Sequence, residues 1–562
     1  MAIKSRWSAP VPVVSLPTYL FESSAGPLPT VPIWIDANRP DTHYFTMTTY
    51  REWAKRFAAG LTAAGLQPGD RVLLFSGNNI FFPVVILGVM MAGGIFTGAN
   101  PGYNTRELAH QLSDSDPRFL LVAGEALDTG LEAAKIGKMG KDRVFTFDDA
   151  VFDGKGQGRL GTRHWKHLIA SPETGERFQW EEVSTLAGAN RTAALNYSSG
   201  TTGLPKGVEI SHYNFVANCF QVKHGAELDP DFKENLKTAR WLCFLPMYHA
   251  MAQTFFATIG PKRGIPSYMM PKFDFLKMLD CVQRFRITDL ILVPPIVVAL
   301  AKHPAPRNGT FDLSSVRLVN SGAAPLGKEV SEEVEALWEK DKVKVKQGWG
   351  LTEATCWVLG WDPRDPGKPG SVGELAANCE AMIIDQDGIT ELGCEQRGEI
   401  WIRAPNVMKG YWRNPTATKE ALTEDRWLKT GDVAYYDKEG KFFIVDRIKE
   451  MIKVKGNQVA PAELEAILLE HPSVADAAVI GVQRNDEEHP RAYIVTKQGT
   501  RTTAEEIVQF MEKRASRTKR ITGGVVFIQS IPRNPSGKIL RKYLRERAKA
   551  EHGASQPRAS KL

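Results

Sequence analysis

The sequence predicts an α/β protein. A large N-terminal domain combines α/β subdomains with a β-rich subdomain, and a small α+β domain follows it. Two observations support this fold class. Short apolar runs such as 71–75 alternate with helical stretches such as 50–66 and 80–92, which is the pattern of parallel βαβ units. Beyond residue 370 the character changes to β-rich segments with short turns between them, at 399–403 and 442–445.

The remaining elements extend this pattern in chain order. Residues 1–40 are rich in proline and predict irregular structure. Apolar runs with the length of buried strands occur at 119–122, 290–293 and 316–319, and a helix is expected near 105–113. The charged segment 446–450 ends a strand and marks a domain boundary. The small unit beyond it should contain helices at 461–470 and 504–514 and strands at 477–482, 491–496 and 524–528.

Composition places the chain among ordinary globular proteins. Of its 562 residues, 43% are hydrophobic and 24% are charged, which excludes a disordered, collagen-like or coiled-coil chain. The 71 basic and 64 acidic residues give a charge of +7 without a clustered basic run, so nucleic acid is not an expected partner. The six cysteines form no C-x-x-C pair, which argues against zinc or redox motifs and indicates a reducing compartment.

Two segments bear on location. The apolar run 80–99 is interrupted by Pro83, Gly88, Gly93 and Gly94, so we expect a buried core helix and no stable membrane span. The N-terminal residues show no continuous apolar stretch of the kind found in secretory signals. The polar tail ends in Ser560-Lys561-Leu562, which matches the S-K-L address read by the peroxisomal import receptor. These residues predict a peroxisomal protein.

A loop rich in glycine and hydroxyl groups is the strongest local signal. It joins the strand-like segments 193–195 and 208–210 and lacks the Walker A order, because its lysine precedes the last glycine. Backbone N–H groups, hydroxyls and one lysine converging on one point would cradle a polyphosphate. The expected donors are Ser198, Ser199, Gly200, Thr201, Thr202, Gly203 and Lys206. Segment 156–161 also fits G-x-G-x-x-G, but no strand precedes it, so we expect a surface loop.

Together with other motifs in the same order, this loop resembles the acyl-adenylate-forming enzymes, a superfamily of acyl-CoA synthetases, adenylation domains and beetle luciferases. The resemblance covers about residues 20–547 and is closest to the 4-coumarate–CoA ligase branch. The further motifs are Leu245-Pro-Met-Tyr-His249, Ser321-Gly-Ala-Ala-Pro325, Gln347-Gly-Trp-Gly-Leu-Thr-Glu353, Gly398-Glu-Ile-Trp-Ile-Arg403, Lys429-Thr-Gly-Asp432, Asp446-Arg-Ile-Lys-Glu450 and Pro535-Ser-Gly-Lys538.

The resemblance implies that a carboxylic acid and ATP give acyl-AMP and pyrophosphate, after which CoA displaces AMP. Lys538 would bridge the carboxylate and the α-phosphate, where a point charge can follow the developing negative charge. Asp432 would accept hydrogen bonds from the ribose hydroxyls, and Arg447 would hold ribose and phosphate. Thr352 would contact the α-phosphate, and Glu353 would bind Mg²⁺. The expected cofactors and co-substrates are ATP, Mg²⁺ and CoA.

The same resemblance assigns the adenine site and the carboxylate site. Ala323 and Ala324 would offer backbone contacts to adenine, next to the segment Gln347-Gly348-Trp349-Gly350. Trp349 replaces a usual tyrosine, so it could stack on adenine but lacks the hydroxyl group. His249 would lie at the substrate carboxylate and act in catalysis.

In such enzymes the small domain swings between the two half-reactions. The resemblance divides this chain into an AMP-binding domain (1–445), a hinge (446–450), a lid domain (451–547) and a flexible tail (548–562). Lys449 matches the hinge position, where the backbone dihedrals change. In one pose Lys538 enters the site. In the other pose the thiolation tunnel is completed by Lys453, Lys455, Gly456 and Gln458.

The acyl pocket predicts substrate class. The stretch after His249 carries no acid that could bind an α-ammonium group, so amino-acid substrates are disfavoured. Trp357 should shorten or reshape the pocket, because aromatic bulk excludes volume. An apolar medium-chain or aryl acid is expected, bound by His249, Met251, Phe255, Trp357 and Val358.

Three other functions remain open from the sequence. A luciferase-like oxidase shares the fold and the peroxisomal address. A carrier-protein-loading adenylation enzyme would have to act in trans, because the chain has no appended carrier domain. An inactive adenylate-binding scaffold is disfavoured by the presence of Lys538, Glu353 and Asp432.

Overall fold

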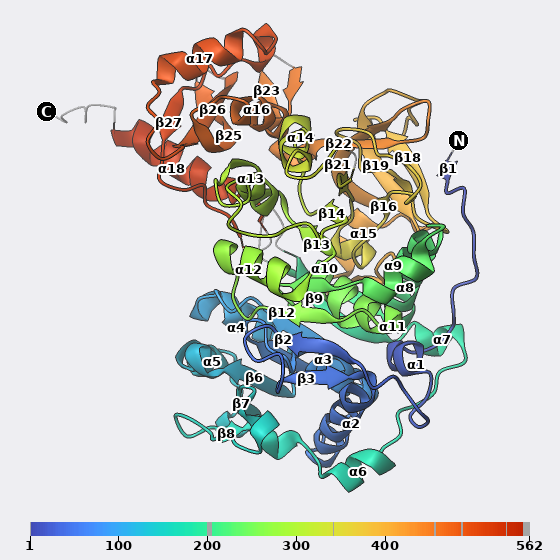
Figure 1. The fold of residues 1–562 in the computed structure, drawn as a ribbon. Coiled ribbons are helices and arrows are strands. Elements are labelled where there is room, and N and C mark those ends of the chain that lie inside the picture. The colour runs from blue at the N-terminus through green and yellow to red at the C-terminus, as the bar shows by residue number, and fades with distance from the viewer. Residues whose placement is uncertain are drawn as a thin grey trace, which may run out of the picture.

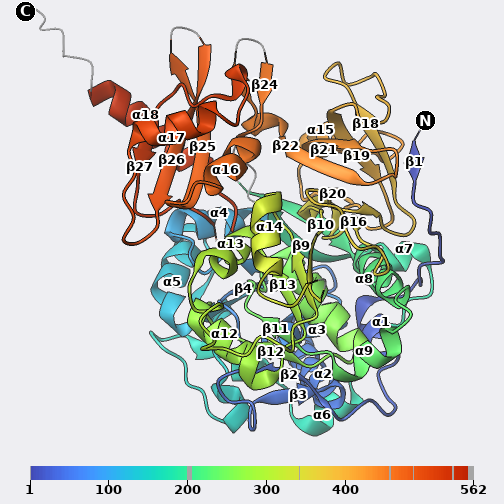
Figure 2. The same ribbon diagram turned by 45° about the horizontal axis from the view of Figure 1, so that its top comes forward.

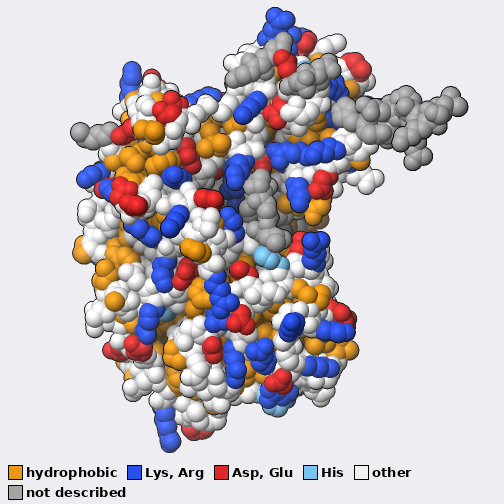
Figure 3. Space-filling view, turned by 180° about the vertical axis from the view of Figure 1, so that it is seen from behind, with side chains coloured by type: hydrophobic (Ala, Val, Ile, Leu, Met, Phe, Trp, Pro, Cys, Tyr) orange, Lys and Arg blue, Asp and Glu red, His pale blue; other side chains and the backbone are white. Residues whose placement is uncertain are grey.

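The computed structural model describes residues 2–198, 205–340, 342–454, 457–484, 487–534 and 537–554. A large domain built on two mainly parallel sheets carries a β-rich subdomain, and a small C-terminal domain lies beside that subdomain at one end of the molecule (Figures 1 and 2). On the face seen in Figure 3, acidic and basic side chains are interspersed. The predicted fold class is therefore confirmed.

The first sheet of the large domain has the order β20-β10-β9-β5-β4-β6-β7-β8. Its strands from β9 to β8 run parallel, and the β9–β10 hairpin carries the glycine-rich loop at its turn. The strands are β4 Arg71–Phe75, β5 Ile95–Ala99, β6 Phe119–Ala123, β7 Val144–Phe147, β8 Arg163–His164, β9 Thr192–Ser198, β10 Lys206–Ser211 and β20 Gly410–Tyr411.

Helices connect and cover this sheet as the alternating pattern predicts. The expected core helix is α3 (Phe82–Met91), and all ten of its residues are buried. Within the described part of the chain, no helix has the length and apolar character needed to cross a bilayer. The other helices of this region are α1 Leu16–Phe21, α2 Met47–Ala63, α4 Thr105–Ser115, α5 Leu127–Ile136, α6 Pro172–Arg177 and α7 Leu186–Ala189.

The second sheet, of order β15-β14-β13-β11-β12-β2-β3, is parallel except at the β2–β3 edge. Its strands are β2 Pro32–Asp36, β3 Tyr44–Thr46, β11 Trp241–Cys243, β12 Ser267–Met269, β13 Asp289–Leu292, β14 Leu318–Ser321 and β15 Lys344–Gln347. The associated helices are α8 His212–Glu227, α9 Phe232–Thr238, α10 Ala250–Ala252, the π-helix Gln253–Ile259, α11 Gly260–Arg263, α12 Phe275–Phe285, α13 Pro294–Lys302 and α14 Lys328–Glu335.

The β-rich subdomain is an antiparallel sheet of order β1-β18-β19-β21-β22. Its strands are β1 Ile3–Lys4, β18 Glu380–Ile384, β19 Gly398–Arg403, β21 Leu428–Tyr436 and β22 Phe442–Arg447. The short pair β16 (Leu359–Gly360) and β17 (Glu374–Leu375) and helix α15 (Pro415–Ala421) lie between these strands in the chain.

The small domain has its own hydrophobic cores, one around Leu464 and Ile494 and one around Tyr493 and Leu544. It follows a short 3₁₀ turn at 448–450, close to the predicted boundary at 446. Its elements are β23 Ile452–Val454, β24 Asn457–Val459, α16 Pro461–Leu469, β25 Val474–Arg484, β26 Glu487–Thr496, α17 Ala504–Glu512, β27 Val525–Phe527 and α18 Arg541–Ala554.

The expectation of irregular structure over residues 1–40 was wrong in part. This segment contributes β1, α1 and β2. The run Pro32–Asp36 forms a strand because it pairs with β12 and buries Trp34, contacts that lie far along the chain. The G-x-G-x-x-G segment 156–161 lies in the loop before β8, as expected.

Candidate active site

The site forms at the carboxyl ends of β14 and β15, where parallel strands deliver their following loops to one edge of the sheet. Gly322 and Ala323 follow β14, which ends at Ser321, and Gly348 to Gly350 follow β15, which ends at Gln347. Ala323 has φ of +74°, a backbone conformation that is costly for a residue with a side chain. Gly350 is required locally, because a Cβ atom there would lie 1.6 Å from the carbonyl oxygen of Cys356. The chain is thus tightly constrained at the predicted adenine site.

Trp349 makes a polar contact that sequence reasoning missed. Its indole Nε1–H donates a 2.8 Å hydrogen bond to Oδ2 of Asp432, which comes from β21. The missing tyrosine hydroxyl is therefore replaced by another donor. Arg447 Nε lies 3.4 Å from the other oxygen, Oδ1, which has no hydrogen-bond donor within the described residues. Burial raises the pKa of Asp432, and the charge of Arg447 opposes that rise. The free acceptor Oδ1 fits a ribose hydroxyl.

Lys538 extends from the small domain towards Asp432 and Arg447. Its backbone N–H donates to Oδ1 of Asn534, and the N–H of Asn534 donates back to the carbonyl of Lys538, which closes a tight turn. Gly537, with φ of +83°, packs this turn against Val293 and Pro295 at the start of α13. Burial and then the charge of Arg447 lower the pKa of Lys538, Asp432 and Glu353 counteract them, and the resulting pKa is about 8.

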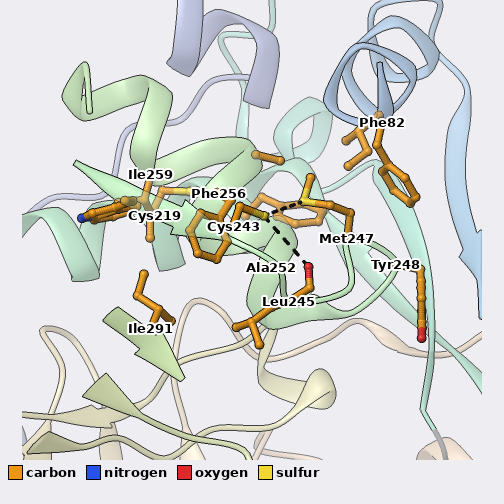
Figure 4. Packing of buried hydrophobic residues seen from close by; sticks show 14 of the residues in the cluster. Phe82, Cys219, Cys243, Leu245, Met247, Tyr248, Ala252, Phe256, Ile259 and Ile291 are labelled. Atoms are coloured by element: carbon orange, nitrogen blue, oxygen red, sulfur yellow. Dashed lines mark hydrogen bonds between the residues drawn. The ribbon is translucent and has the colours of Figure 1, made fainter. Parts of the chain in front are cut away.

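His249 ends the loop that follows β11. Met247 and Tyr248 anchor this loop in the core, where Cys243 lies 4.0 Å from the sulfur of Met247 (Figure 4). Nε2 of His249 is buried without a hydrogen-bond partner in the described residues. Burial, and then the charge of Lys538, lower the pKa of His249 to about 4. The imidazole is therefore neutral near pH 7 and can hydrogen-bond to a bound carboxylate.

The phosphate side of the site is partly described. Ser198 pairs with Lys206 at the end of the β9–β10 hairpin next to the connecting loop, and Ser199, Gly200, Thr201, Thr202 and Gly203 lie outside the described residues. Lys206 Nζ lies 4.9 Å from the ring centre of Tyr411, whose hydroxyl donates a 3.0 Å hydrogen bond to Glu353. Tyr411 was not singled out by any motif. Glu353 and Thr352 share a 3₁₀ turn, Thr352–Ala354.

The residues around Glu353 fit a Mg²⁺ ion whose ligands come mainly from the phosphates of ATP and from water. Among the described residues there is no cluster of three or more His, Cys, Asp or Glu side chains that could hold a metal. Mg²⁺ commonly takes one or two protein carboxylates and completes its shell with phosphates and water. The single carboxylate of Glu353, beside the phosphate loop, is consistent with such a site.

A cavity of about 580 Å³ joins the predicted carboxylate site to the predicted acyl pocket. Lys538, His249 and Thr352 line one part of it, and Met251, Phe255 and Trp357 line the next part. The indole of Trp357 packs against Gly360 and Gly225, and a Cβ atom added to Gly360 would lie only 2.1 Å from it. The cavity continues beyond Trp357 towards the amino ends of the strands, lined there by Trp241, Asp289 and Arg317. Trp357 is part of the cavity wall, and the prediction that it shortens or reshapes the pocket stays a prediction.

Two predicted site residues have other surroundings. Val358 does not line this cavity; it is fully buried in the large-domain core, because neighbouring residues of an extended chain point in opposite directions and Trp357 takes the cavity side. Both polar atoms of the Gln347 amide bond to the backbone of Leu326, so this side chain holds the loop that follows Ala324. Gly348 lines the cavity, and Ala324 adjoins it without lining it.

The predicted thiolation residues lie away from this site. Lys453 and Gln458 pair across the β23–β24 hairpin, at the end of the small domain farthest from the large domain (Figure 2). Lys455 and Gly456 lie outside the described residues. Lys449 is exposed in the 3₁₀ turn between β22 and β23. With Lys538 inserted and the hairpin remote, the geometry is that expected for the adenylation step.

Comparison with known proteins identifies the family. Residues 21–412 match the AMP-binding enzyme family, and residues 463–538 match the AMP-binding enzyme C-terminal domain. The chain belongs to the AMP-binding enzyme family. It is an ATP-dependent acid–CoA ligase that works through an acyl-AMP intermediate.

Individual relatives agree over most of the chain. A 4-coumarate–CoA ligase-like protein of Arabidopsis thaliana is 40% identical over 87% of this chain and 84% of its own length. A peroxisomal OPC-8:0-CoA ligase of the same plant is 39% identical over 86% of this chain and 85% of its own length. The structure of ATP-bound MatB from Rhodopseudomonas palustris superposes with a TM-score of 0.78, at 27% identity, over 96% and 99% of the two chains. Relatives of nearly equal similarity carry different acid names, so identity alone does not select the acid.

Proposed function

We propose that Lys538, His249 and Thr352 carry out the adenylation step of this AMP-binding enzyme. The observation that supports these roles is one continuous cavity, which joins Lys538 and His249 to the acyl side and passes the Trp349–Asp432 pair. A substrate carboxylate oxygen would attack the α-phosphorus of ATP, and the bond to pyrophosphate would break. The ammonium group of Lys538 would stabilise the negative charge that builds up between the two anions.

His249 and Thr352 would position the reacting groups. The neutral imidazole can donate its N–H to the second carboxylate oxygen, which leaves the first oxygen free to attack. Thr352 lines the same part of the cavity and would contact the α-phosphate. Asp432 would bind the ribose through its free oxygen, with Arg447 beside it. Glu353 would hold Mg²⁺, which would neutralise phosphate charge.

The second half-reaction requires a different pose. After pyrophosphate leaves, the thiolate of CoA would attack the acyl carbon, and AMP would depart with the electrons of the acyl–phosphate bond. We assign Lys453, Lys455, Gly456 and Gln458 to the tunnel that admits CoA, and Lys449 to the hinge. The position of the β23–β24 hairpin, remote from the site while Lys538 is inserted, supports a rotation between the steps.

The acid has an apolar body. Next to His249 the cavity is lined by apolar side chains from several elements, namely Val222, Met251, Phe255, Ile291 and Trp357. Burying alkyl or aryl surface there would supply binding free energy of about 25 cal/mol per Å². A medium-chain aliphatic or an aryl acid fits this wall, and an α-ammonium group would find no carboxylate in it.

We also propose that the protein is peroxisomal, through the address Ser560-Lys561-Leu562. A relative that carries a peroxisomal name supports this location. A fluorescent protein fused ahead of these residues should collect in peroxisomes and should become cytosolic when the three residues are deleted. Cytosolic fluorescence from both fusions would contradict the proposal.

Pyrophosphate release over a panel of carboxylic acids, with ATP and Mg²⁺, tests the function. Sustained turnover should require CoA, yield acyl-CoA and AMP, and be lost in Lys538→Ala. Lys549→Ala is the matched control, because Lys549 is an exposed lysine on the same domain. Light or an oxidised product without CoA would favour the oxidase. Acyl-AMP formation without acyl-CoA would favour carrier loading, and ATP binding without pyrophosphate release would favour the scaffold.

A further inference from the structure

The cavity has a second, polar end. It follows one face of the second sheet, from the carboxyl ends of the strands to their amino ends. Along β14 this path runs from Ser321, the last residue of the strand, back to Arg317, the residue just before the strand, which is four residues or about 13 Å at about 3.3 Å per residue. The apolar wall around Trp357 lies between the two ends. The far end is lined by Trp241, Arg263, Asp289 and Arg317.

Arg263, the last residue of α11, differs from the other cations at this end. Arg317 is engaged by the side chains of Asn235 and Thr238, and Lys346 by the backbone carbonyl of Asp365. No carboxylate or carbonyl of the described residues pairs with the Arg263 guanidinium, and its Nε is buried without an acceptor.

The surroundings of Arg263 confine this unpaired group. Its guanidinium lies 5.2 Å from the ring centre of Phe232 and 5.7 Å from that of Trp241, two aromatic faces that hold it in place. Burial lowers its pKa, while Asp289 and Glu227 counteract this from beyond salt-bridge distance. Asp289 itself accepts a hydrogen bond from Thr288. A buried donor without an acceptor is costly, and Arg263 has one in its Nε while it lines the cavity, so its position at this wall points to a ligand.

We infer that Arg263 binds an oxygen at the distal end of the substrate, so that the acid is bifunctional, with an apolar body between its reacting carboxylate and a terminal oxygen acceptor. This rests on the proposed function, because the reacting carboxylate must lie at His249 and Lys538. A terminal hydroxyl could also donate to Asp289, whereas a terminal carboxylate would pair with the guanidinium alone. The terminal hydroxyl and the terminal carboxylate each offer an oxygen atom that can accept a hydrogen bond from Arg263.

Three acids of equal length test the inference: decanoic, ω-hydroxydecanoic and decanedioic acid. An extended ten-carbon acid has a length comparable to the distance of about 13 Å that separates the two ends of the cavity along β14. The measurement is kcat/KM for acyl-CoA formation with the wild type, Arg263→Met and Arg263→Lys. The wild type should prefer an oxygen-terminated acid over decanoic acid by about tenfold or more, since hydrogen bonds to charged groups are among the stronger ones. Whether the hydroxyl or the second carboxylate is preferred tells which form the oxygen takes.

Arg263→Met should abolish this preference while turnover of decanoic acid is kept or raised. Arg263→Lys should retain part of the preference. Arg284 is an exposed arginine on α12, and Arg284→Met is the matched control. It should change neither the preference for an oxygen-terminated acid nor the turnover of decanoic acid. If the variants turn over decanoic acid and the preference is absent in the wild type or survives Arg263→Met, the inference is overturned and the proposed function stands. If no acid gives acyl-CoA with the wild type, the proposed function fails, and this inference with it.

Discussion

At the scale of single residues, the nucleotide end of the site depends on the bond between Trp349 and Asp432. Trp349→Phe keeps an aromatic ring for adenine but removes the only hydrogen-bond donor to Oδ2 of the buried carboxylate within the described residues. Leaving a buried acceptor unpaired costs about 1–3 kcal/mol, so KM for ATP should rise about tenfold. The measurement is pyrophosphate exchange at varied ATP.

Trp349→Tyr tests whether a different hydrogen-bond donor at this position can replace the indole N–H. If its hydroxyl reaches Asp432, KM should return towards the wild-type value. An unchanged KM for ATP in Trp349→Phe would show that the indole N–H does not position Asp432 for the nucleotide.

The pKa of Lys538 sets a second expectation at this scale. Below its lowered pKa of about 8 the ammonium carries its charge, and above that value the charge is lost. Because kcat/KM reports the free enzyme, kcat/KM for acyl-AMP formation without CoA should fall as the pH rises through about 8. Lys538→Arg, whose guanidinium stays protonated, should be slower but lack this alkaline fall. An identical fall in both proteins would assign it to another group.

At the scale of elements, the turn from Asn534 to Lys538 brings Lys538, the residue that we propose to be catalytic, onto the large domain. Gly537→Ala would place a Cβ 3.1 Å from both Val293 and Pro295, at a φ that strains any side chain. Overpacking costs about 1–3 kcal/mol, so acyl-AMP formation should slow by about five- to a hundredfold. Transfer of a supplied acyl-AMP to CoA should be spared, because that step needs the other pose. Equal losses in both half-reactions would refute the role of this turn in docking.

The elements also show what the sequence alone could predict. Strands such as β4 and helices such as α3 carry their pattern locally, and their expected positions agree with the structure to within a few residues. Strand β2 was missed because its pairing with β12 lies far along the chain. Val358 was misassigned because a motif gives an order of residues but not the direction of each side chain. Arg263 belongs to no motif, and only the folded chain reveals that its Nε is buried without an acceptor among the described residues.

At the scale of the whole molecule, the contact between α14 and α16 gives a direct test of domain rotation. A Cβ built on Gly327, at the start of α14, lies 3.3 Å from Cβ of Ala466 on α16, close to the 3.5–4.5 Å of disulfides. Gly327→Cys with Ala466→Cys should therefore form a bridge under oxidising conditions and hold the small domain in the pose described here. The oxidised protein should form acyl-AMP at close to the wild-type rate but make little acyl-CoA, and a thiol reductant should restore acyl-CoA formation.

The two single-cysteine variants control for the native thiols, of which Cys219, Cys243, Cys281 and Cys379 are buried. Full acyl-CoA formation by the bridged protein would mean that both half-reactions proceed without separation of α14 from α16. In that case the remote β23–β24 hairpin could not be part of the thiolation site. Loss of acyl-AMP formation on bridging would instead mean that adenylation needs a pose other than the one in which Lys538 is buried beside His249 and Asp432.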